Sequence, residues 1–144
     1  KHLAKLVSIE HHEAWYRKVE NMLSTNNINN VEYLFIPKVN HPTNIDDSEE
    51  SLEKLSGMEE RLGYANYANK VSEYPDDYFD FVLIDGRVRV NCGKNSIPKL
   101  KSGGIFVLDN SERPRYNPLH EELKHWPVVN TTNGLTNTTI WFKP

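Results

Sequence analysis

Residues 81–90, FVLIDGRVRV, join a run of four apolar side chains directly to an acid, a glycine and two arginines. The segment Phe79–Ile84 is nearly continuous in apolar character, which is typical of a strand in a parallel sheet that is covered on both faces. A charged residue just outside such a strand is partly desolvated and needs a partner. Gly86 allows a sharp turn or the close approach of a ligand. Arg87 and Arg89 are near enough to balance the acid or to hold an anionic substrate.

Two other predicted strands also end in an acid. The run at residues 6–9 leads into Glu10, and the run at residues 105–108 leads into Asp109. With Asp85 after the central run, three carboxylates follow three strands, and the carboxyl ends of parallel strands form the ligand-binding edge of a sheet. Each acid alone is more simply explained as a helix cap or a turn residue. Three acids at one predicted edge favour a ligand site there.

The remaining apolar patterns alternate between strand and helix. A further strand is predicted at residues 31–36, and helices are predicted between the strands. One helix rests on an apolar stripe with helical spacing, formed by Trp15, Val19, Met22 and Leu23. Further helices are expected at residues 51–62, 64–74 and 90–100, and one is marked by Leu119, Leu123 and Trp126. Pro98 either kinks the helix at 90–100 or starts a separate last turn.

The C-terminal part of the sequence has strand and turn signals, and its last two strands follow each other without a helix between them. Ser102-Gly103-Gly104 predicts a turn into the strand at 105–108. Two final strands within residues 128–142 are joined through Asn133-Gly134, which is a hairpin signal. Strands alternating with helices and followed by an antiparallel pair predict an α/β fold, a doubly wound mixed sheet. We expect one domain over residues 1–144, with an insertion at 38–78 that has no strand signal.

Composition excludes several classes of function. The net charge is −3 and there is no basic block, so nucleic acid is a poor candidate partner. No apolar run is long enough to cross a bilayer, and the N-terminal residues do not have the pattern of a signal peptide. The single cysteine, Cys92, fits a reducing compartment, so a cytoplasmic location is expected.

In this order, the motifs resemble the class I S-adenosylmethionine-dependent methyltransferases, from their second strand to their C-terminus. The matching stretches are LVSIEHHEAWYRKV, DFVLIDGR, IPKLKSGGIFVLDN and TNTTIWF. The segment IDGRVR resembles a subgroup of these enzymes whose substrates are poorly defined. The resemblance implies a Rossmann-like fold with a reversed last strand, and S-adenosylmethionine as cofactor.

The resemblance also implies roles for particular residues. Glu10 would accept hydrogen bonds from the ribose hydroxyls of the cofactor, with His11 beside it, although adjacent histidines at a helix start are more often surface residues. Asp85 would face the methionine end of the cofactor or the reacting centre. Arg87, Asp109 and Asn110 would complete the catalytic group.

A divalent cation is a further implication. In cation-dependent O-methyltransferases, an Asp at this strand end and an Asp-Asn pair after the next strand hold a metal ion. The corresponding residues here are Asp85, Asp109 and Asn110, whose oxygen atoms suit magnesium, calcium or manganese. The ion would lower the pKa of a substrate hydroxyl and orient it. The simpler interpretation is that the Asp-Asn pair forms a turn.

Other candidates have plain structural interpretations. Cys92 is expected to be a packing residue rather than a nucleophile. Arg113 and Arg115 could bind an acidic substrate, or they could pair with Glu112 in a solvated loop. Tyr64, Tyr67 and Tyr74 could line a substrate pocket, but aromatic residues at helical spacing usually belong to a core.

Two features of the methyltransferase pattern are missing. The sequence has no Gly-rich turn of the kind that follows the family's first strand, and no acid follows the strand at 31–36, because Ile36 runs into Pro37. In the family that first strand lies mid-sheet, and its removal would leave unpaired backbone groups. We therefore expect a fragment of a longer protein, a strand supplied by another chain, or a rearranged sheet.

The leading hypothesis is an S-adenosylmethionine-dependent methyltransferase that acts on a hydroxyl or similar nucleophile of a small-molecule acceptor. One alternative is a methyltransferase-like module that binds or assembles without catalysis. A second alternative is a nicotinamide-dependent oxidoreductase, because an acid at the same strand end can hold a ribose there too. The acceptor and the oligomeric state, including a homo-oligomer, stay open.

Overall fold

The computed structural model describes residues 4–40 and 61–144, and the chain divides into two compact units, Lys1–Tyr67 and Ala68–Pro144. Each unit is described by itself. The helix expected at residues 51–62 lies almost wholly outside the described residues, as does much of the insertion at 38–78. The prediction of a single domain therefore stays a prediction.

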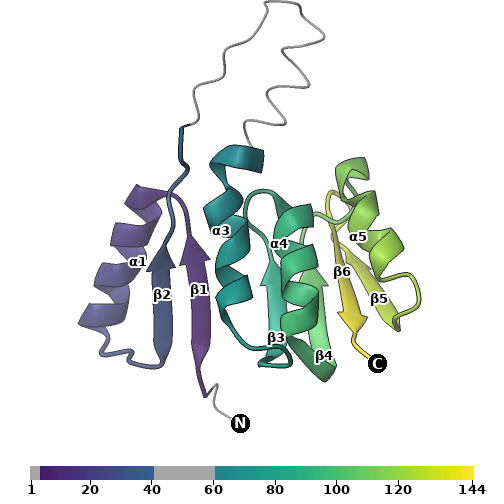
Figure 1. Cartoon of the computed structure of the whole chain (residues 1–144), viewed down its shortest axis with the longest axis horizontal. Helices are drawn as coiled ribbons and strands as arrows, with labels where there is room; N and C mark the ends of the chain where they lie inside the picture. Colours follow the sequence, from purple (N-terminus) through teal and green to yellow (C-terminus); the bar gives the residue numbers. More distant parts are fainter. Residues whose placement is uncertain (1–3, 41–60) are drawn as a thin grey trace, which may run out of the picture. The chain divides into compact units, whose positions relative to one another are not determined.

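The first unit is built on two parallel strands joined by a helix (Figure 1). Strand β1 (Leu6–Glu10) pairs with β2 (Val31–Phe35), in register from Leu6 opposite Val31 to Glu10 opposite Phe35. Helix α1 (Glu13–Thr25) connects them. Both predicted strands are confirmed, and Glu10 occupies the last position of its strand.

Helix α1 uses a narrower apolar face than the sequence predicts. Tyr16 stacks on Tyr33 with ring centroids 4.8 Å apart, and it also contacts Phe35. Trp15 and Met22, which belong to the predicted stripe, are 55% and 53% exposed. At about 100° per residue, positions 16, 19 and 23 form one stripe, and Trp15 points away from it. The inclusion of Trp15 and Met22 in the buried face is therefore wrong.

Most of the remaining elements belong to the second unit, which begins within α3. The elements from α3 onward are, in order, α3 (Ala65–Asn69), η1 (Lys70–Glu73), β3 (Phe79–Ile84), α4 (Arg89–Ser96), η2 (Ile97–Lys99), β4 (Leu100–Leu108), η3 (Pro114–Tyr116), α5 (Asn117–Glu122), β5 (Val128–Thr132) and β6 (Asn137–Phe142). Pro98 thus starts a separate last turn after α4, as one of the two sequence interpretations expected. The helix marked by Leu119, Leu123 and Trp126 is shorter than predicted, because it ends at Glu122.

The sheet of the second unit has the order β3-β4-β6-β5. Strands β3 and β4 are parallel, whereas β6 runs antiparallel to both of its neighbours. The turn between β5 and β6 is closed by Asn133, whose side-chain oxygen accepts hydrogen bonds from the N–H groups of Leu135 and Thr136. The predicted mixed sheet and C-terminal antiparallel pair are confirmed.

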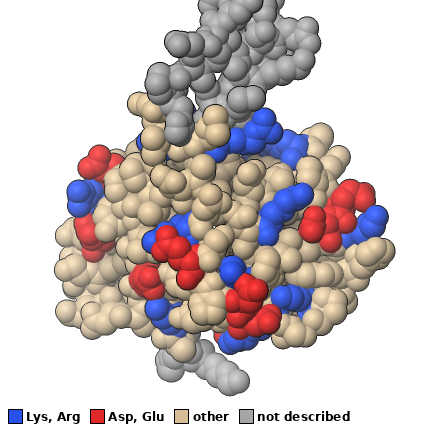
Figure 2. Space-filling model, viewed as in Figure 1, with Lys and Arg blue, Asp and Glu red and all other residues tan. Residues whose placement is uncertain are grey.

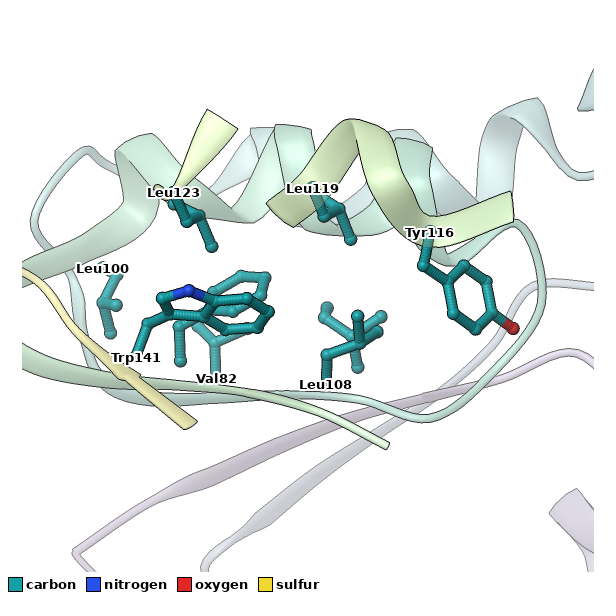
Figure 3. Packing of buried hydrophobic residues seen from close by; sticks show 9 residues of the cluster. Val82, Leu100, Leu108, Tyr116, Leu119, Leu123 and Trp141 are labelled. Carbon is teal, nitrogen blue, oxygen red and sulfur yellow. The ribbon is translucent and has the colours of Figure 1, made fainter. Parts of the chain in front are cut away.

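The hydrophobic core of this unit lies between the sheet and helices α4 and α5 (Figure 3). Its buried members are Val82, Ile84, Leu100, Phe106, Leu108, Tyr116, Leu119, Leu123 and Trp141. The two helices approach closely at Gly93, where an added Cβ would lie 2.8 Å from a Leu119 methyl carbon. The absence of a side chain at this position therefore lets α5 pack directly against α4.

The opposite face of this sheet is less covered than the sequence predicts. Val82 and Ile84 point into the core, but Phe81 and Leu83 are 52% and 55% exposed. Side chains alternate between the faces of a strand, and the core described for this unit lies on one face only. The expectation that the Phe79–Ile84 strand is buried on both faces is therefore wrong for the described residues.

The Gly-Gly pair does not form a turn before β4. Strand β4 already begins at Leu100, and Gly103 and Gly104 lie inside it. Gly103 has a φ of +76°, and the register between β3 and β4 shifts in this region, so Phe79 pairs with Leu100 and Phe81 with Ile105. The glycines therefore make an irregularity within the strand, and the predicted turn is wrong.

Charged side chains of both signs are distributed over the surface. On the face in Figure 2, most lysines and arginines lie near acidic side chains. The ion pairs include Lys99 with Asp76 at 2.6 Å and Lys101 with Asp80 at 2.9 Å. Within the described parts of the chain, no helix combines the length and apolar character needed to cross a membrane.

Candidate functional site

Asp85 and Asp109 lie at the same edge of the second unit. Asp85 directly follows β3 and Asp109 directly follows β4, and the last paired residues of these parallel strands are Ile84 and Leu108. The backbone N–H of Asp109 donates to the carbonyl of Ile84 at 3.2 Å. The prediction that the acids of these two strands meet at one edge is confirmed.

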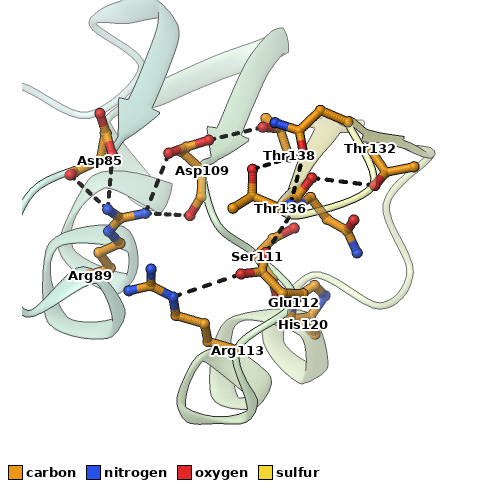
Figure 4. A network of polar contacts seen from close by, with 12 residues as sticks. Asp85, Arg89, Asp109, Ser111, Glu112, Arg113, His120, Thr132, Thr136 and Thr138 are labelled. Carbon is orange, nitrogen blue, oxygen red and sulfur yellow. Dashed lines mark hydrogen bonds and ion pairs between the residues drawn. The ribbon is translucent and has the colours of Figure 1, made fainter.

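Arg89 joins the two strand ends (Figure 4). It is only 8% exposed. Its Nε donates to the carbonyl of Gly86 at 3.0 Å, and its Nη2 donates to Asp85 at both the carbonyl, 2.9 Å, and Oδ1, 2.8 Å. Its Nη1 donates to the carbonyl of Asp109 and lies 4.0 Å from Asp109 Oδ2. One guanidinium therefore holds both aspartates and the loop between β3 and α4.

An unusual backbone conformation brings Arg89 back to the strand ends. Val88, which precedes it, has a φ of +41° and ψ of +44°, a left-handed conformation that β-branched residues rarely adopt. Asn110, at the end of the neighbouring strand, has a φ of +47°. Conformations of this kind cost free energy and are often found at functional sites. Here Val88 directly precedes Arg89 and Asn110 directly follows Asp109, so both conformations adjoin the Asp85–Arg89–Asp109 cluster.

The environment changes the acidity of Asp85. Partial burial raises the pKa of the Asp85 carboxyl, the Arg89 guanidinium opposes that rise, and the nearby carboxyl of Asp109 adds to it. A carboxylate with a raised pKa is a better proton acceptor than an ordinary surface carboxylate. Asp85 is therefore a candidate for acid–base chemistry at this edge.

Further polar contacts fix the end of β4. Thr138 of β6 donates its hydroxyl to Asp109 Oδ1 at 3.0 Å. One strand position further, the buried hydroxyl of Thr139 lies 2.7 Å from the Ser111 hydroxyl and 2.8 Å from Asn130 Oδ1. No buried side-chain nitrogen or oxygen lacks a hydrogen-bond partner within the described ranges. The Asp109 carboxylate is thus held by a side chain of β6, and the contacts of Thr139 join the residues that follow β4 to β5 and β6.

In the first unit, Glu10 shapes the turn between β1 and α1. Its Oε1 accepts hydrogen bonds from the backbone N–H groups of His11 and His12, each at 2.7 Å, and lies 3.2 Å from His11 Nδ1. Its side chain is 25% exposed. No hydrogen bond to Oε2 is found among the described residues. One carboxylate oxygen therefore holds the turn, and the other can accept a hydrogen bond from a ligand.

Aromatic rings surround the His11 side chain. The imidazole makes edge contacts with Tyr64 and Tyr67, with centroids 5.2 and 5.4 Å apart, and Lys38 Nζ lies 5.8 Å from the centroid of the Tyr64 ring. His11 is therefore a packed residue beside Glu10, rather than the surface histidine of the simpler interpretation. Tyr64 and Tyr67 pack around the same side chain.

Several predicted roles are not decided by these contacts. Glu10 belongs to the first unit and the two aspartates belong to the second, so their convergence on one site stays a prediction. The same holds for Asn110 as a ligand and for Arg87, whose side chain is exposed. Arg89 makes the central contacts to Asp85 and Asp109. Sequence reasoning placed this arginine near the acids without assigning it to the site.

The cluster gives a direct test of the predicted metal site. Any divalent ion bound by both Asp85 and Asp109 would sit beside the Arg89 guanidinium, whose positive charge would repel it. No group of three or more His, Cys, Asp or Glu side chains placed to hold a metal ion occurs in residues 4–40 and 61–144. The arrangement of these side chains therefore does not fit a shared divalent ion.

Two other candidates have structural roles. Burial raises the pKa of the Cys92 thiol to about 12, and its side chain packs against the core, so it is a packing residue as expected. Arg113 Nε lies 3.7 Å from Glu112 Oε1, which agrees with the simpler interpretation of that arginine.

Comparison with solved structures identifies the fold. The chain superposes on a methyltransferase from Geobacter sulfurreducens with a TM-score of 0.59, at 12% identity, over 96% of this chain and 58% of that one. It superposes on a Staphylococcus aureus protein, assigned by name to the caffeoyl-CoA O-methyltransferases, with a TM-score of 0.60, at 13% identity, over 97% and 65%. The chain has the Rossmann-like fold of these methyltransferases. The fold class predicted from sequence is confirmed.

The name of a third similar structure refers to a different methyl acceptor. The tRNA (m1A58) methyltransferase TrmI from Aquifex aeolicus matches with a TM-score of 0.54, at 12% identity, over 97% of this chain and 53% of that one. The chain thus spans between 53% and 65% of the length of these three proteins. No protein-family model matches the sequence, and no curated protein matches it.

Proposed function

We propose that this protein is an S-adenosylmethionine-dependent methyltransferase that transfers a methyl group to a hydroxyl or similar nucleophile of a small-molecule acceptor. The observation that carries the proposal is the mixed sheet β3-β4-β6-β5 with two acids at the end of its parallel pair. Its likeness to methyltransferase structures supports the reaction class.

The cofactor would be bound in part by Glu10. Its Oε1 is engaged by two backbone N–H groups, which fixes the carboxylate, while Oε2 can accept a hydrogen bond from a ribose hydroxyl. The His11 ring, held against Tyr64 and Tyr67, places an aromatic surface beside this carboxylate. These side chains fit a nucleoside with a free diol.

Asp85 would act on the acceptor. When bound, the cofactor would supply an electrophilic methyl group, to which the acceptor oxygen bonds as the carbon–sulfur bond breaks. Asp85, with its raised pKa, would take the proton released by the acceptor hydroxyl. Arg89 would hold the Asp85 carboxylate in a single orientation during this transfer.

A small acceptor is favoured over nucleic acid by the charge of the chain. The net charge is −3, and basic side chains on the face in Figure 2 mostly lie close to acidic ones. Nucleic-acid binding draws most of its affinity from clustered Lys and Arg. The name of the Staphylococcus aureus neighbour refers to an O-methyltransferase, which is consistent with a hydroxyl acceptor here.

The nicotinamide-dependent oxidoreductase is the weaker alternative. Dinucleotide-binding sheets of the doubly wound type are mostly parallel. In this chain β6 is inserted antiparallel between β4 and β5, which favours the methyltransferase. The non-catalytic module remains the second alternative, and ligand binding tests it.

Titration calorimetry on the intact protein distinguishes the three functions. We expect S-adenosylmethionine to bind, and Glu10→Gln to weaken that binding about 10- to 100-fold, because a hydrogen bond to a charged acceptor is lost. Glutamine keeps an oxygen for the backbone N–H groups of the turn, so the fold should persist. Glu13→Gln is the matched control, since Glu13 forms an exposed surface pair with Arg17 at 3.8 Å.

Each outcome of this titration has a clear meaning. Heat with S-adenosylmethionine that is reduced only by Glu10→Gln supports the proposal. Heat with NAD⁺ alone would replace it by the oxidoreductase. No heat with either ligand at high micromolar concentration would leave the non-catalytic module as the better account.

A further inference from the structure

The guanidinium of Arg89 occupies the space between the two acidic strand ends (Figure 4). Its donors are directed to Gly86, Asp85 and Asp109, and only 9% of its side chain is exposed. The guanidinium carbon also lies 5.6 Å from the centroid of the Tyr116 ring. A buried charge held by backbone carbonyls, a carboxylate and an aromatic face is a fixed feature of the fold.

This position is the one that a divalent cation would need. Magnesium or manganese bound by Asp85 and Asp109 would require carboxylate oxygens close to the ion at about 2 Å. Asp85 Oδ1 is already 2.8 Å from Arg89 Nη2, and Asp109 Oδ2 is 4.0 Å from Nη1. The guanidinium is planar and always charged, so it cannot make room for an ion by losing a proton.

We propose that Arg89 is the built-in cation of this site, a positioning residue that holds Asp85 and Asp109 together and makes a divalent ion unnecessary. The claim that Arg89 positions Asp85 for methyl transfer rests on the proposed function. The claim that Arg89 takes the place of a divalent ion does not. Arg89 offsets one of the two negative charges of the carboxylates and holds the Asp85 carboxylate in one orientation. The left-handed conformation of Val88 is what returns Arg89 to the strand ends.

The test is a titration of the intact protein with Mn²⁺, in which the electron paramagnetic resonance signal of the free ion reports how much is bound. We expect no stoichiometric binding by the wild-type protein up to concentrations on the order of 1 mM, the weak end of protein carboxylate sites. Arg89→Met removes the charge and keeps the apolar stem, so it should raise Mn²⁺ affinity by at least about tenfold. Adding Asp109→Asn to that variant should abolish the gain.

Two control variants test whether the charge at position 89 is what governs Mn²⁺ binding. Arg89→Lys keeps a positive charge at the site and should bind no more Mn²⁺ than the wild type. Arg113→Met changes an arginine that pairs with Glu112 instead of the two aspartates, and it should also leave Mn²⁺ binding unchanged. A gain of affinity confined to Arg89→Met supports the assignment.

Other results would overturn it. One Mn²⁺ bound by the wild-type protein and lost in Asp85→Asn would show that a divalent ion shares the site with Arg89. A folded Arg89→Met variant with unchanged affinity would show that the guanidinium is not what excludes the ion. If Arg89→Met does not fold, the wild-type titration decides alone. None of these readouts depends on S-adenosylmethionine, so failure of the proposed function would be seen separately in the calorimetry.

Discussion

Single side chains close the loops that follow the strands. Glu10 accepts hydrogen bonds from two backbone N–H groups, Arg89 donates to three backbone carbonyls, and Glu112 accepts a hydrogen bond from the N–H of Asn137 at 2.9 Å. In each case a charged group satisfies backbone atoms that the regular sheet does not pair. The loops of each unit therefore depend on charge, and this dependence can be measured.

Glu112 gives a prediction of pH dependence. The backbone N–H of Asn137 holds the pKa of the Glu112 carboxyl below its ordinary value of 4.5, and its own backbone N–H and Arg113 act in the same direction. A folded-state pKa below the unfolded one contributes stability that is fully present above the unfolded value and is lost as pH falls through the folded value. The stability difference between wild type and Glu112→Gln should therefore be constant near neutral pH and shrink in acid.

Thermal unfolding of both proteins from about pH 7 down to about pH 3 measures this pH dependence of the stability difference. Glu121→Gln is the control, because Glu121 forms an exposed surface pair with Lys124 at 3.3 Å, and its substitution should change the unfolding midpoint little. A difference between wild type and Glu112→Gln that stays the same over the whole range would contradict the assigned role of the Asn137 N–H.

The acids of the site could be predicted from sequence, but the arginine could not. An apolar run followed by Asp marks a strand end, and this simple signal placed both Asp85 and Asp109 correctly. The choice between Arg87 and Arg89 depends on the backbone of Val88, whose left-handed conformation has no sequence signal, since valine is unfavourable there. Sequence reasoning therefore assigned Arg87 to the site, whereas the structure brings Arg89 to Asp85.

At the scale of elements, helices α4 and α5 hold the sheet that carries the aspartates. Leu119 of α5 has no exposed surface and packs over Gly93 of α4 and toward Phe106 of β4. Because three elements meet at this side chain, its packing supports the strand end at which Asp109 lies.

We expect Leu119→Ala to lower the free energy of unfolding by about 2–5 kcal/mol, through lost burial and the cavity left behind. Leu135→Ala is the matched control, since Leu135 is 89% exposed, and it should change stability by less than about 0.5 kcal/mol. Chemical denaturation of both variants measures the difference. Equal effects of the two substitutions would mean that the described core is not the stabilising one.

The existence and type of most elements followed from periodicity, while their exact extent did not. The Ser-Gly-Gly stretch is the clearest example, because the same residues signal a turn or an irregularity within a strand. Which of these forms depends on the neighbouring strand: the pairing of Phe79 with Leu100 extends β4 through the glycines. Helix α1 likewise turns Trp15 outward, since only one stripe of the helix can face β2.

At the scale of the whole molecule, the proposed function requires the two units to act together. Glu10 ends β1 in the first unit, and Asp85 and Asp109 follow β3 and β4 in the second. That one cofactor meets Glu10 and Asp85 together is a prediction from the sequence motifs. The sequence motifs predict this arrangement through their order, but the position of one unit relative to the other is a long-range property that local patterns do not encode.

The most direct measurement is a ¹H–¹⁵N NMR titration of the intact protein with S-adenosylhomocysteine, the demethylated form of the cofactor. We predict that the backbone amides of His11 and His12, next to Glu10, shift at the same ligand concentrations as those of Gly86 and Asn110, next to Asp85 and Asp109. Glu10→Gln should weaken both sets of shifts together. Shifts confined to one unit, or no shifts at saturating ligand, would contradict a single cofactor site built from these strand ends.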